Sequence, residues 1–227
     1  GMHNYLISSP TLRNCVFKSN IASYGGGIYN YASSPTISNC TFSNNYTFYE
    51  GGGIYNYNCS PPVSNSTFNN NESQQSGGAI INYISNSIIS NCTFNSNSCT
   101  STSGDYIGGG AILNSSSPVQ ILNSTFSNNS GKQGGAINNY QSSPTITNCL
   151  IYNNTANDNG GGIFNYYASN TIITNTTIVD NIATNGDGIY AQFNTNPVLK
   201  NCIVWNNDIC ISFCWFNKCK VHWFNRC

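Results

Sequence analysis

The sequence predicts an all-β solenoid of about eight coils with about 26 residues each. One observation is a Gly-Gly-Gly-Ile type block that recurs along the 227 residues at spacings of 26, 26, 32, 25, 26 and 26. The other is a block of the Asn-Cys-Thr-Phe type, whose anchor follows the isoleucine by 14 or 15 residues. The isoleucines are Ile28, Ile54, Ile80, Ile112, Ile137, Ile163 and Ile189. The anchors are Phe17, Phe42, Phe68, Phe94, Phe126, Ile151, Ile178 and Val204.

Each repeat contains short segments in which apolar residues alternate with polar ones, separated by turns of Gly, Asn and Ser-Ser-Pro. This period of two indicates strands, and its recurrence predicts that equivalent strands stack in parallel from coil to coil. The residues Met2–Tyr5 overlay Ile28–Tyr31, so we expect the chain to begin inside a repeat and to be a fragment. The predicted repeat domain spans residues 1–207.

The composition excludes several classes of partner. Charged residues make up 6% of the chain and the formal net charge is zero, which removes the basic footprint that DNA, RNA or an anionic membrane requires. No apolar run approaches the ~20 residues of a membrane-spanning helix. With 39% hydrophobic residues and no net charge, the chain is expected to fold rather than to remain disordered.

Asparagine, which occurs 41 times, recurs in three columns of the repeat. Stacked at the ~4.8 Å spacing of strands, each amide can donate to the copy on one side and accept from the copy on the other. We therefore predict three structural amide ladders. The first column is Asn4, Asn30, Asn56, Asn82, Asn114, Asn139 and Asn165, with Ala191 as the exception. The second is Asn14, Asn39, Asn65, Asn91, Asn123, Asn148, Asn175 and Asn201. The third is Asn20, Asn45, Asn71, Asn97, Asn129, Asn154, Asn181 and Asn207.

Five of the 11 cysteines share one column with Ser and Thr, two residues before the second anchor. In a strand this position faces inward, and stacked neighbours there lie farther apart than a disulfide prefers. Free buried thiols are therefore expected at Cys15, Cys40, Cys92, Cys149 and Cys202. Cys59 and Cys99 are placed in turns, where pairing in a secreted protein is left open.

Two places break the repeat. An insertion of six residues lies within Asn95–Gly108 and carries Asp105 and Tyr106, which are read either as part of a tolerated surface loop or as a functional loop. After Asn207 the pattern stops, so residues 208–227 are expected to be an aromatic, cysteine-rich cap or a tail foreign to the native fold. The spacing of Cys210, Cys214, Cys219, His222 and Cys227 matches no standard zinc finger. Neither a metal nor another cofactor is predicted.

The Gly-Gly-Ala-Ile block at Gly77 to Ile80, combined with Phe-x-x-Asn motifs, resembles the paired motifs of polymorphic outer membrane protein repeats. The Phe-x-x-Asn motifs are Phe17 to Asn20, Phe42 to Asn45, Phe68 to Asn71, Phe94 to Asn97 and Phe126 to Asn129. The resemblance covers residues 1–207, and Ile151, Ile178 and Val204 depart from it. It implies a right-handed parallel β-helix of the pectate-lyase-like type that serves as a bacterial adhesin at the cell surface, associated with the outer membrane.

Because pectate-lyase-like folds often cleave polysaccharides, a lyase or glycoside hydrolase is the first alternative. Glycoside hydrolysis needs two carboxyl groups ~5 to 10 Å apart, and only Asp158 and Asp187 lie at related positions of neighbouring coils. The acids are Glu50, Glu72, Asp105, Asp158, Asp180, Asp187 and Asp208. His3 and His222 lie at the chain ends, which leaves no histidine for a central nucleophile–base arrangement. We therefore expect a non-catalytic segment.

A stripe of aromatic residues is the candidate binding surface. Alternation next to the inward isoleucines predicts that Tyr29, Tyr55, Phe164 and Tyr190 point outward. A second aromatic column follows one step past the first asparagine column and consists of Tyr5, Tyr31, Tyr57, Tyr83, Tyr140 and Tyr166. Exposed ring faces suit contact with a glycan or a protein surface, whereas the competing interpretation is that the rings stack on one another and only stabilise a turn.

The predicted function is therefore that of a secreted or surface-displayed adhesin or structural binding module. The candidate contacts are Tyr29, Tyr31, Tyr55, Tyr57, Tyr83, Tyr140, Tyr166, Asp105 and Tyr106. The partner is expected to be a neutral glycan or a host or matrix protein surface, with the oligomeric state left open. Ice binding is the second alternative, because Thr41, Thr67, Thr93, Thr125 and Thr177 form an outward column, although Val16, Leu150 and Ile203 interrupt it.

Overall fold

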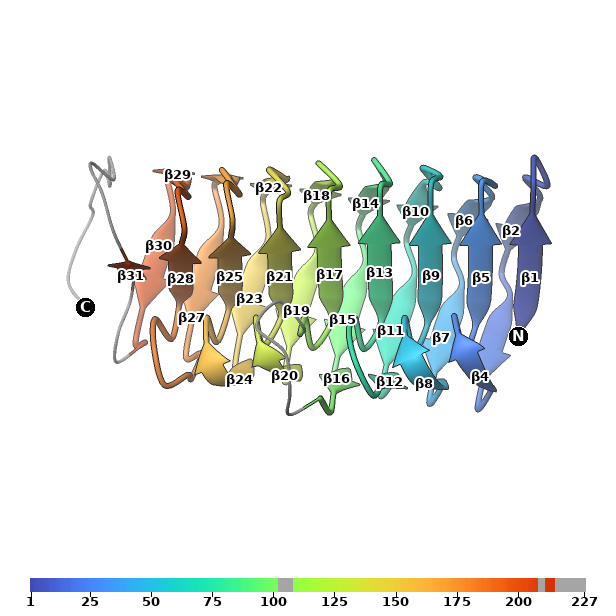
Figure 1. The fold of residues 1–227 in the computed structure, drawn as a ribbon, viewed down its shortest axis with the longest axis horizontal. Helices are drawn as coiled ribbons and strands as arrows, with labels where there is room; N and C mark the ends of the chain where they lie inside the picture. The colour runs from blue at the N-terminus through green and yellow to red at the C-terminus, as the bar shows by residue number, and fades with distance from the viewer. Residues whose placement is uncertain (102–107, 208–210, 215–227) are drawn as a thin grey trace.

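The structure, a computed structural model, describes residues 1–101, 108–207 and 211–214. Every regular element in these residues is a β-strand, and the strands form four parallel sheets that run along the molecule (Figure 1). Each coil of the chain contributes one strand to each of three sheets, and six coils add a strand to a fourth. The predicted all-β solenoid of about eight coils is therefore confirmed.

Sheets A and B are the first two that the chain enters in each coil. Sheet A consists of β1 (Met2–Tyr5), β5 (Ile28–Tyr31), β9 (Ile54–Tyr57), β13 (Ile80–Tyr83), β17 (Ile112–Ser115), β21 (Ile137–Tyr140), β25 (Ile163–Tyr166), β28 (Ile189–Gln192) and β31 (Ile211–Cys214). Sheet B consists of β2 (Thr11–Arg13), β6 (Thr36–Ser38), β10 (Val63–Ser64), β14 (Ile88–Ser90), β18 (Gln120–Leu122), β22 (Thr145–Thr147), β26 (Ile172–Thr174) and β29 (Val198–Lys200).

Sheets C and D complete the coil. Sheet C consists of β3 (Val16–Lys18), β7 (Thr41–Ser43), β11 (Thr67–Asn69), β15 (Thr93–Asn95), β19 (Thr125–Ser127), β23 (Leu150–Tyr152), β27 (Thr177–Val179) and β30 (Ile203–Trp205). Sheet D consists of β4 (Ile21–Tyr24), β8 (Tyr46–Glu50), β12 (Glu72–Ser73), β16 (Ser98–Cys99), β20 (Ser130–Gln133) and β24 (Thr155–Asn159).

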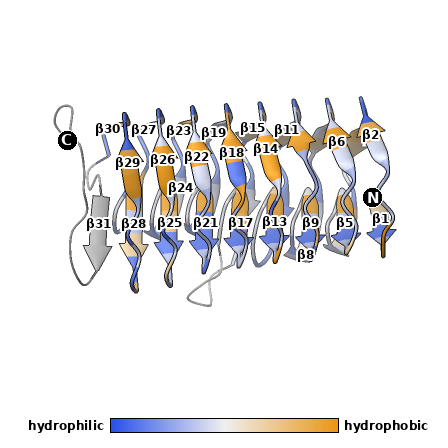
Figure 2. Ribbon diagram, turned by 90° about the horizontal axis from the view of Figure 1, so that it is seen from above, coloured by the Kyte–Doolittle hydropathy of each residue, from blue (hydrophilic) through white to orange (hydrophobic). Residues whose placement is uncertain are grey.

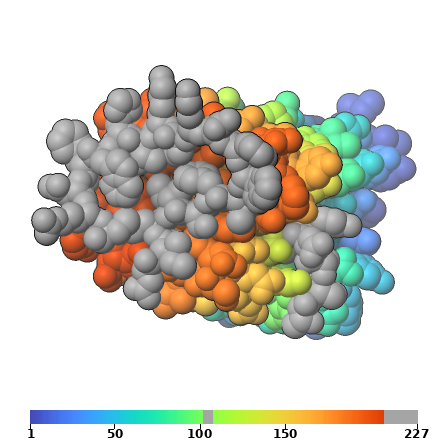
Figure 3. Space-filling model, turned by 60° about the vertical axis from the view of Figure 1, so that its left-hand side comes forward, coloured from blue at the N-terminus to red at the C-terminus, as the bar shows by residue number. Residues whose placement is uncertain are grey.

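The register between coils follows the sequence repeat. Ile28 pairs with Ile54 and Phe42 pairs with Phe68, as their shared columns predict. The longer coil does not disturb this register, because Ile80 still pairs with Ile112 across the inserted residues. Figure 3 shows the result as successive coloured bands of coils. In the described part of the chain there is no helix with the length and apolar character needed to cross a bilayer.

The core consists of stacked identical side chains inside the coil. Five phenylalanines of sheet C form one stack, with ring centroids 4.7 to 4.9 Å apart and nearly parallel planes. The inward-facing isoleucines of sheet A and of sheet B complete one continuous cluster of buried residues. Figure 2 shows hydrophobic residues recurring at the same level of successive strands. The stack consists of Phe17, Phe42, Phe68, Phe94 and Phe126.

Two of the three predicted asparagine ladders are confirmed. In the Asn4–Asn165 column, each side-chain amide donates to the carbonyl oxygen of the next at 2.8 to 3.0 Å. In the Asn20–Asn207 column the corresponding distances are 2.8 to 3.2 Å. The Asn20–Asn207 ladder also forms hydrogen bonds with the backbone. The Asn71 amide donates to the carbonyl of Phe42 at 3.0 Å, and its side-chain oxygen accepts from the backbone N–H of Asn45. Buried amides of both columns are thereby satisfied by their own copies. The exception is the amide nitrogen of Asn165, which is buried without a hydrogen-bond partner because Ala191 occupies its column in the next coil.

The predicted ladder of the Asn14–Asn201 column is wrong. These side chains are exposed, and their backbone is left-handed, with φ near +50° at every position. Asparagine is needed there because its short polar side chain tolerates the left-handed turn that joins sheet B to sheet C. A bond from Asn148 to Asn123 at 3.2 Å joins two of these exposed side chains. The column therefore shapes the corner of the coil and does not satisfy a buried amide.

The glycines before sheet A allow neighbouring coils to approach closely. Gly51 has a φ of +69°, and a Cβ on Gly52 would lie 2.2 Å from the backbone oxygen of Gly78 in the next coil. Glycine alone adopts the left-handed conformation of Gly51 without strain, and at Gly52 any Cβ would clash with backbone that cannot move away. The recurring glycine block is therefore a packing requirement of the corner that joins sheet D to sheet A.

The cysteines of the repeat column are free thiols, as predicted: Cys40, Cys92 and Cys149 are buried, and Cys15 and Cys202 are partly buried. Burial raises the pKa of Cys92 and of Cys149 to about 11. Cys59 and Cys99, for which pairing was left open, are also free and buried.

Past Asn207, β31 adds one parallel strand beside β28. The rest of the predicted cap or tail, with His222 among its residues, lies outside the described residues.

Candidate binding groove

Three hollows lie along the solenoid where the outer face of sheet A meets the ends of the sheet D strands. Their volumes are about 380, 330 and 410 Å³, and each is lined by residues from both sides. Near the N-terminus the two sides are in direct contact, since the Tyr24 ring of sheet D lies edge-on to Tyr55 of sheet A at 5.2 Å. We call this line of hollows the groove.

The floor of the groove is the first outward column of sheet A. The sequence predicts that its aromatic members point out of the coil, and they do, because they lie outside the main core in a second apolar cluster around Tyr55, Ile81 and Leu113. The expectation that they are exposed is wrong for Tyr55, Phe164 and Tyr190, which are buried, whereas Tyr29 is partly exposed. Tyr55 is 8% exposed and Phe164 is fully buried, since neighbouring side chains cover this column. The floor column is Tyr29, Tyr55, Ile81, Leu113, Asn138, Phe164 and Tyr190.

Beside the floor column lies the second outward column of sheet A, which we call the tyrosine column; its members Tyr83, Tyr140 and Tyr166 line the middle and C-terminal hollows. Its members in coil order are Tyr5, Tyr31, Tyr57, Tyr83, Ser115, Tyr140, Tyr166 and Gln192. Tyr31, Tyr57 and Tyr83 stack with centroids 5.1 and 5.3 Å apart and planes within 7° of parallel. Tyr140 and Tyr166 form a separate stacked pair at 5.9 Å. Ser115 separates these two groups.

This stacking changes what the tyrosines can offer to a ligand. The sequence interpretation relied on exposed ring faces, but in Tyr31 and Tyr57 the faces pack on the neighbouring rings. The faces of these two rings are therefore covered, which leaves their edges and phenol groups as the parts that a ligand could contact. Tyr83 is different, because it is 38% exposed and its register partner on the far side is Ser115, which has no ring. One face of Tyr83 is therefore not covered by the tyrosine column.

Glu50 is the chemically unusual residue of the groove, and the sequence interpretation did not single it out. It ends β8 and lines the middle hollow together with Gln75, Ser76 and Tyr83. Burial raises the pKa of its carboxyl from 4.5 to about 7, because the charged form loses hydration there. The signal that could have identified it is its position: Glu50 shares a column with Tyr24 and Ser76, both neutral.

The stability of the protein should fall as pH rises from about 4.5 to about 7, by about 2 to 3 kcal/mol, because of Glu50. Because the pKa of Glu50 is higher in the folded than in the unfolded protein, the folded protein holds this proton more tightly. The resulting stabilisation is complete at a pH below the unfolded-state pKa and is lost as the pH rises through the folded-state pKa. Urea unfolding across this pH range measures it. In Glu50→Gln the fall should disappear, whereas Glu72→Gln should retain it. Equal pH profiles for wild type and Glu50→Gln would contradict this assignment.

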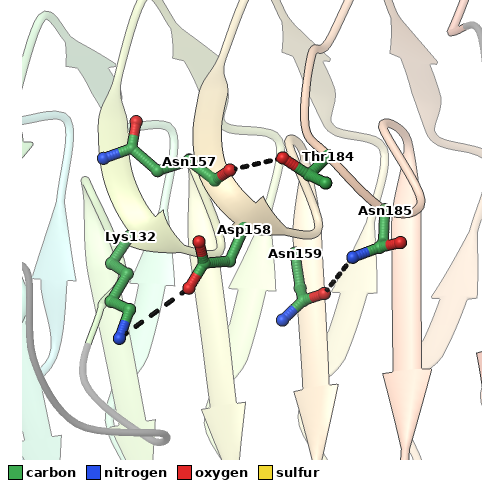
Figure 4. A network of polar contacts seen from close by, with 6 residues as sticks. All are labelled: Lys132, Asn157, Asp158, Asn159, Thr184 and Asn185. Carbon is green, nitrogen blue, oxygen red and sulfur yellow. Dashed lines mark hydrogen bonds and ion pairs between the residues drawn. The ribbon is translucent and has the colours of Figure 1, made fainter.

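The end of the groove nearer the C-terminus is polar. Lys132 Nζ lies 3.7 Å from the carboxylate of Asp158, so these two residues form an ion pair. Beside this pair, the Thr184 hydroxyl donates to the backbone carbonyl of Asn157, and the Asn185 amide donates to the side-chain oxygen of Asn159 at 3.0 Å (Figure 4). The hollow here is lined by Asp158, Asn159 and Tyr166, among others.

The acids considered for catalysis occupy different settings. Asp158 is engaged with Lys132, whereas Asp187 is buried and accepts a hydrogen bond from the backbone N–H of Ala183. Among the described residues, no group of three or more His, Cys, Asp or Glu side chains is placed to hold a metal ion. Asp105 and Tyr106, the candidate residues of the insertion, lie outside the described residues.

Comparison with known proteins agrees with the fold. A family model described as a right-handed β-helix region matches residues 1–151 and 107–225. The match does not extend to the narrower resemblance to polymorphic outer membrane protein repeats. Searches of curated proteins and of solved structures found no match. Because the family model covers nearly the whole chain, the chain belongs to the right-handed β-helix family.

Proposed function

We propose that this β-helix is a secreted or surface-displayed adhesive module without catalytic activity, and that it binds an extended neutral glycan along the groove. The observation that carries the proposal is the stack of Tyr31, Tyr57 and Tyr83, which repeats a phenol group every 5.1 to 5.3 Å beside the groove. A polymer with a similar repeat can make the same contact at each coil.

The chemistry of the groove suits a sugar chain. Sugars combine apolar C–H faces with many hydroxyl groups, so they need an apolar surface and a dense set of donors and acceptors. Ile81 and Leu113 provide apolar lining in the middle hollow, and the polar lining there includes Gln75, Ser76, Tyr83 and Tyr140. Such a combination of apolar lining with a few placed polar groups is typical of small-molecule sites.

The electrostatics of the groove support a neutral ligand. Along the described residues, the ion pair at the groove is Lys132 with Asp158, near the C-terminal end. The net charge of the whole chain is zero. Long-range steering of a charged polymer therefore has no source here. Glycoside hydrolysis requires two nearby carboxyl groups, and the described lining of the middle hollow supplies Glu50 as its carboxyl.

Binding to soluble neutral polysaccharides, such as xylan, β-glucan and galactomannan, should be detected by affinity electrophoresis and quantified by titration calorimetry. Affinity should change little between about 50 mM and about 1 M salt, because no screened charge pairs contribute. The triple variant Tyr31→Phe, Tyr57→Phe, Tyr83→Phe keeps the ring stack and removes three hydroxyls. It should bind at least about tenfold more weakly, since each lost hydrogen bond contributes about 1 kcal/mol.

The matched control is Tyr152→Phe, which removes one tyrosine hydroxyl from sheet C, away from the groove lining. It should bind as the wild type does. Circular dichroism and thermal unfolding should be unchanged in both variants, because the rings remain in place. A wild-type protein that binds none of the neutral polysaccharides would refute the proposed function. A triple variant with wild-type affinity would show that the hydroxyls of the tyrosine column do not make the contact.

A further inference from the structure

The middle hollow of the groove has a feature that a neutral sugar chain alone does not require. It has a volume of about 330 Å³ and lies where Ser115 interrupts the tyrosine column. Its lining combines the Glu50 carboxyl and the Gln75 amide with the apolar side chains of Ile81 and Leu113. A carboxyl group thus lies in a hollow that is large enough for a small ring.

The Glu50 carboxyl has no partner among the described residues. The hydrogen bond to Glu50 uses its backbone oxygen, which accepts from Gly25 N–H at 3.1 Å. The hollow is lined by no Lys, Arg or His of the described chain. Among the described residues, the other ionisable groups around Glu50 are the phenols of Tyr24, Tyr55, Tyr83 and Tyr140 and the thiol of Cys99, none of which can carry a positive charge. The described lining therefore places no positive charge opposite the carboxyl, and a ligand with a cationic group could supply one.

Tyr83 completes the site. The tyrosine column covers one of its faces with Tyr57 at 5.3 Å, and the other face is directed along the solenoid axis toward Ser115. An uncovered aromatic face attracts cations and also packs against the C–H face of a sugar ring. A ring that stacks there lies in the same hollow as the Glu50 carboxyl and the Gln75 amide.

We propose that this hollow is a subsite for an amino sugar with a free primary amine, whose ring stacks on Tyr83 and whose ammonium group pairs with the Glu50 carboxylate. The proposal rests on the proposed function, since the amino sugar is a single charged unit in the otherwise neutral glycan of the groove. An ammonium group supplies charge-assisted hydrogen bonds to Glu50 and can also donate to the side-chain oxygen of Gln75. An N-acetylated sugar lacks the charge and is bulkier at that position.

Recognition of the ammonium group should depend on pH. Burial of Glu50 favours its protonated form up to about pH 7, and a bound ammonium group favours the ionised form instead. Binding of the amine therefore releases the Glu50 proton at mildly acidic pH. The preference for the amine should consequently strengthen as pH rises toward about 7.

The test uses titration calorimetry with short oligomers of glucosamine, N-acetylglucosamine and glucose, all of the same length. At about pH 7 the glucosamine oligomer should bind about tenfold more tightly than the other two, and at about pH 5.5 the difference should fall to about threefold or less. Heats measured in buffers of different ionisation enthalpy should show proton release on binding of the amine at mildly acidic pH.

The variant Glu50→Gln keeps the size of the side chain and removes the charge. It should lose the preference for glucosamine and still bind neutral polysaccharide, whereas Glu72→Gln, in the same sheet but outside the hollow lining, should behave as the wild type does. An unchanged preference in Glu50→Gln, or equal affinity for all three oligomers in the wild type, would refute the amine subsite alone. The proposed function fails separately, if the wild type binds no neutral polysaccharide.

Discussion

Replacing Phe94 with alanine should lower the free energy of unfolding by about 4 to 5 kcal/mol. Phe94 is fully buried, and its ring lies between those of Phe68 at 4.8 Å and Phe126 at 4.7 Å. Truncation removes the buried ring and leaves a cavity between two rings whose positions are set by the strand register. The loss of two stacked aromatic pairs adds to the cost. Urea unfolding followed by circular dichroism measures the change.

The control for Phe94→Ala is Phe94→Ile. Isoleucine already occupies this column at Ile151 and Ile178, where it is fully buried and in register with the phenylalanine stack. The Ile variant should lose about 1 to 2 kcal/mol, because it retains most of the apolar volume and loses the ring stacking. Equal losses for the Ala and Ile variants would show that stacking, and not filled volume, stabilises the column.

Replacing Asn71 with alanine should lower the free energy of unfolding by about 4 kcal/mol, since several hydrogen bonds of the Asn20–Asn207 ladder are lost together. Its amide donates to the Phe42 carbonyl at 3.0 Å and to Asn97 at 2.9 Å, and its oxygen accepts from the backbone and side chain of Asn45. The backbone groups of Phe42 and Asn45 are then left without these side-chain partners inside the coil. Thermal and urea unfolding both report the loss.

The matched control lies one residue earlier in the chain. Asn70 is exposed and left-handed, with a φ of +53°. Asn70→Gly should change stability by less than about 1 kcal/mol, because glycine adopts this conformation without strain. If Asn70→Gly destabilised the protein as much as Asn71→Ala, the ladder would not be the source of the stability.

The architecture of this protein could be predicted from its sequence because each coil repeats the same pattern of inward, outward and turn residues. The register of Ile28 with Ile54, and of Phe42 with Phe68, follows from the 26-residue spacing alone. The insertion before Ile112 leaves the register intact, since Ile80 and Ile112 still pair. Identical residues at identical positions therefore have identical surroundings.

Asparagine was harder to interpret, because one residue type serves two purposes in this fold. Asn71 satisfies buried groups, and Asn65 adopts a left-handed turn. The alternation of the strand separates the two cases. Asn65 directly precedes the inward Ser66, so its side chain must point outward, whereas Asn71 follows the left-handed Asn70 and points inward. The number of residues between an asparagine and the nearest inward anchor is therefore more informative than its recurrence.

The groove could be predicted only in part. The tyrosine column lies at the positions and in the register that the repeat predicts, but the direction of its ring faces depends on stacking between coils. The burial of Tyr55 and Glu50 depends on which side chains of sheet D and sheet A meet, as Tyr24 and Tyr55 do. A repeat pattern contains the order of the sheets and not the contacts between side chains of different sheets. The candidate site was therefore recognised as a stripe, and its hollow and its carboxyl group were not.

The direction of the hydrogen bonds between coils has a mechanical consequence. Strands cross the solenoid, so the bonds between Ile28 and Ile54, and between their equivalents, run along its long axis. Tension between the two ends pulls along these bonds and separates one coil at a time from the end of the solenoid. It does not load all the bonds of a sheet together in shear. Each coil that opens releases about 26 residues, or about 90 Å of extended chain. Under load, a molecule of this kind lengthens in steps, and the coils that remain closed keep their part of the groove.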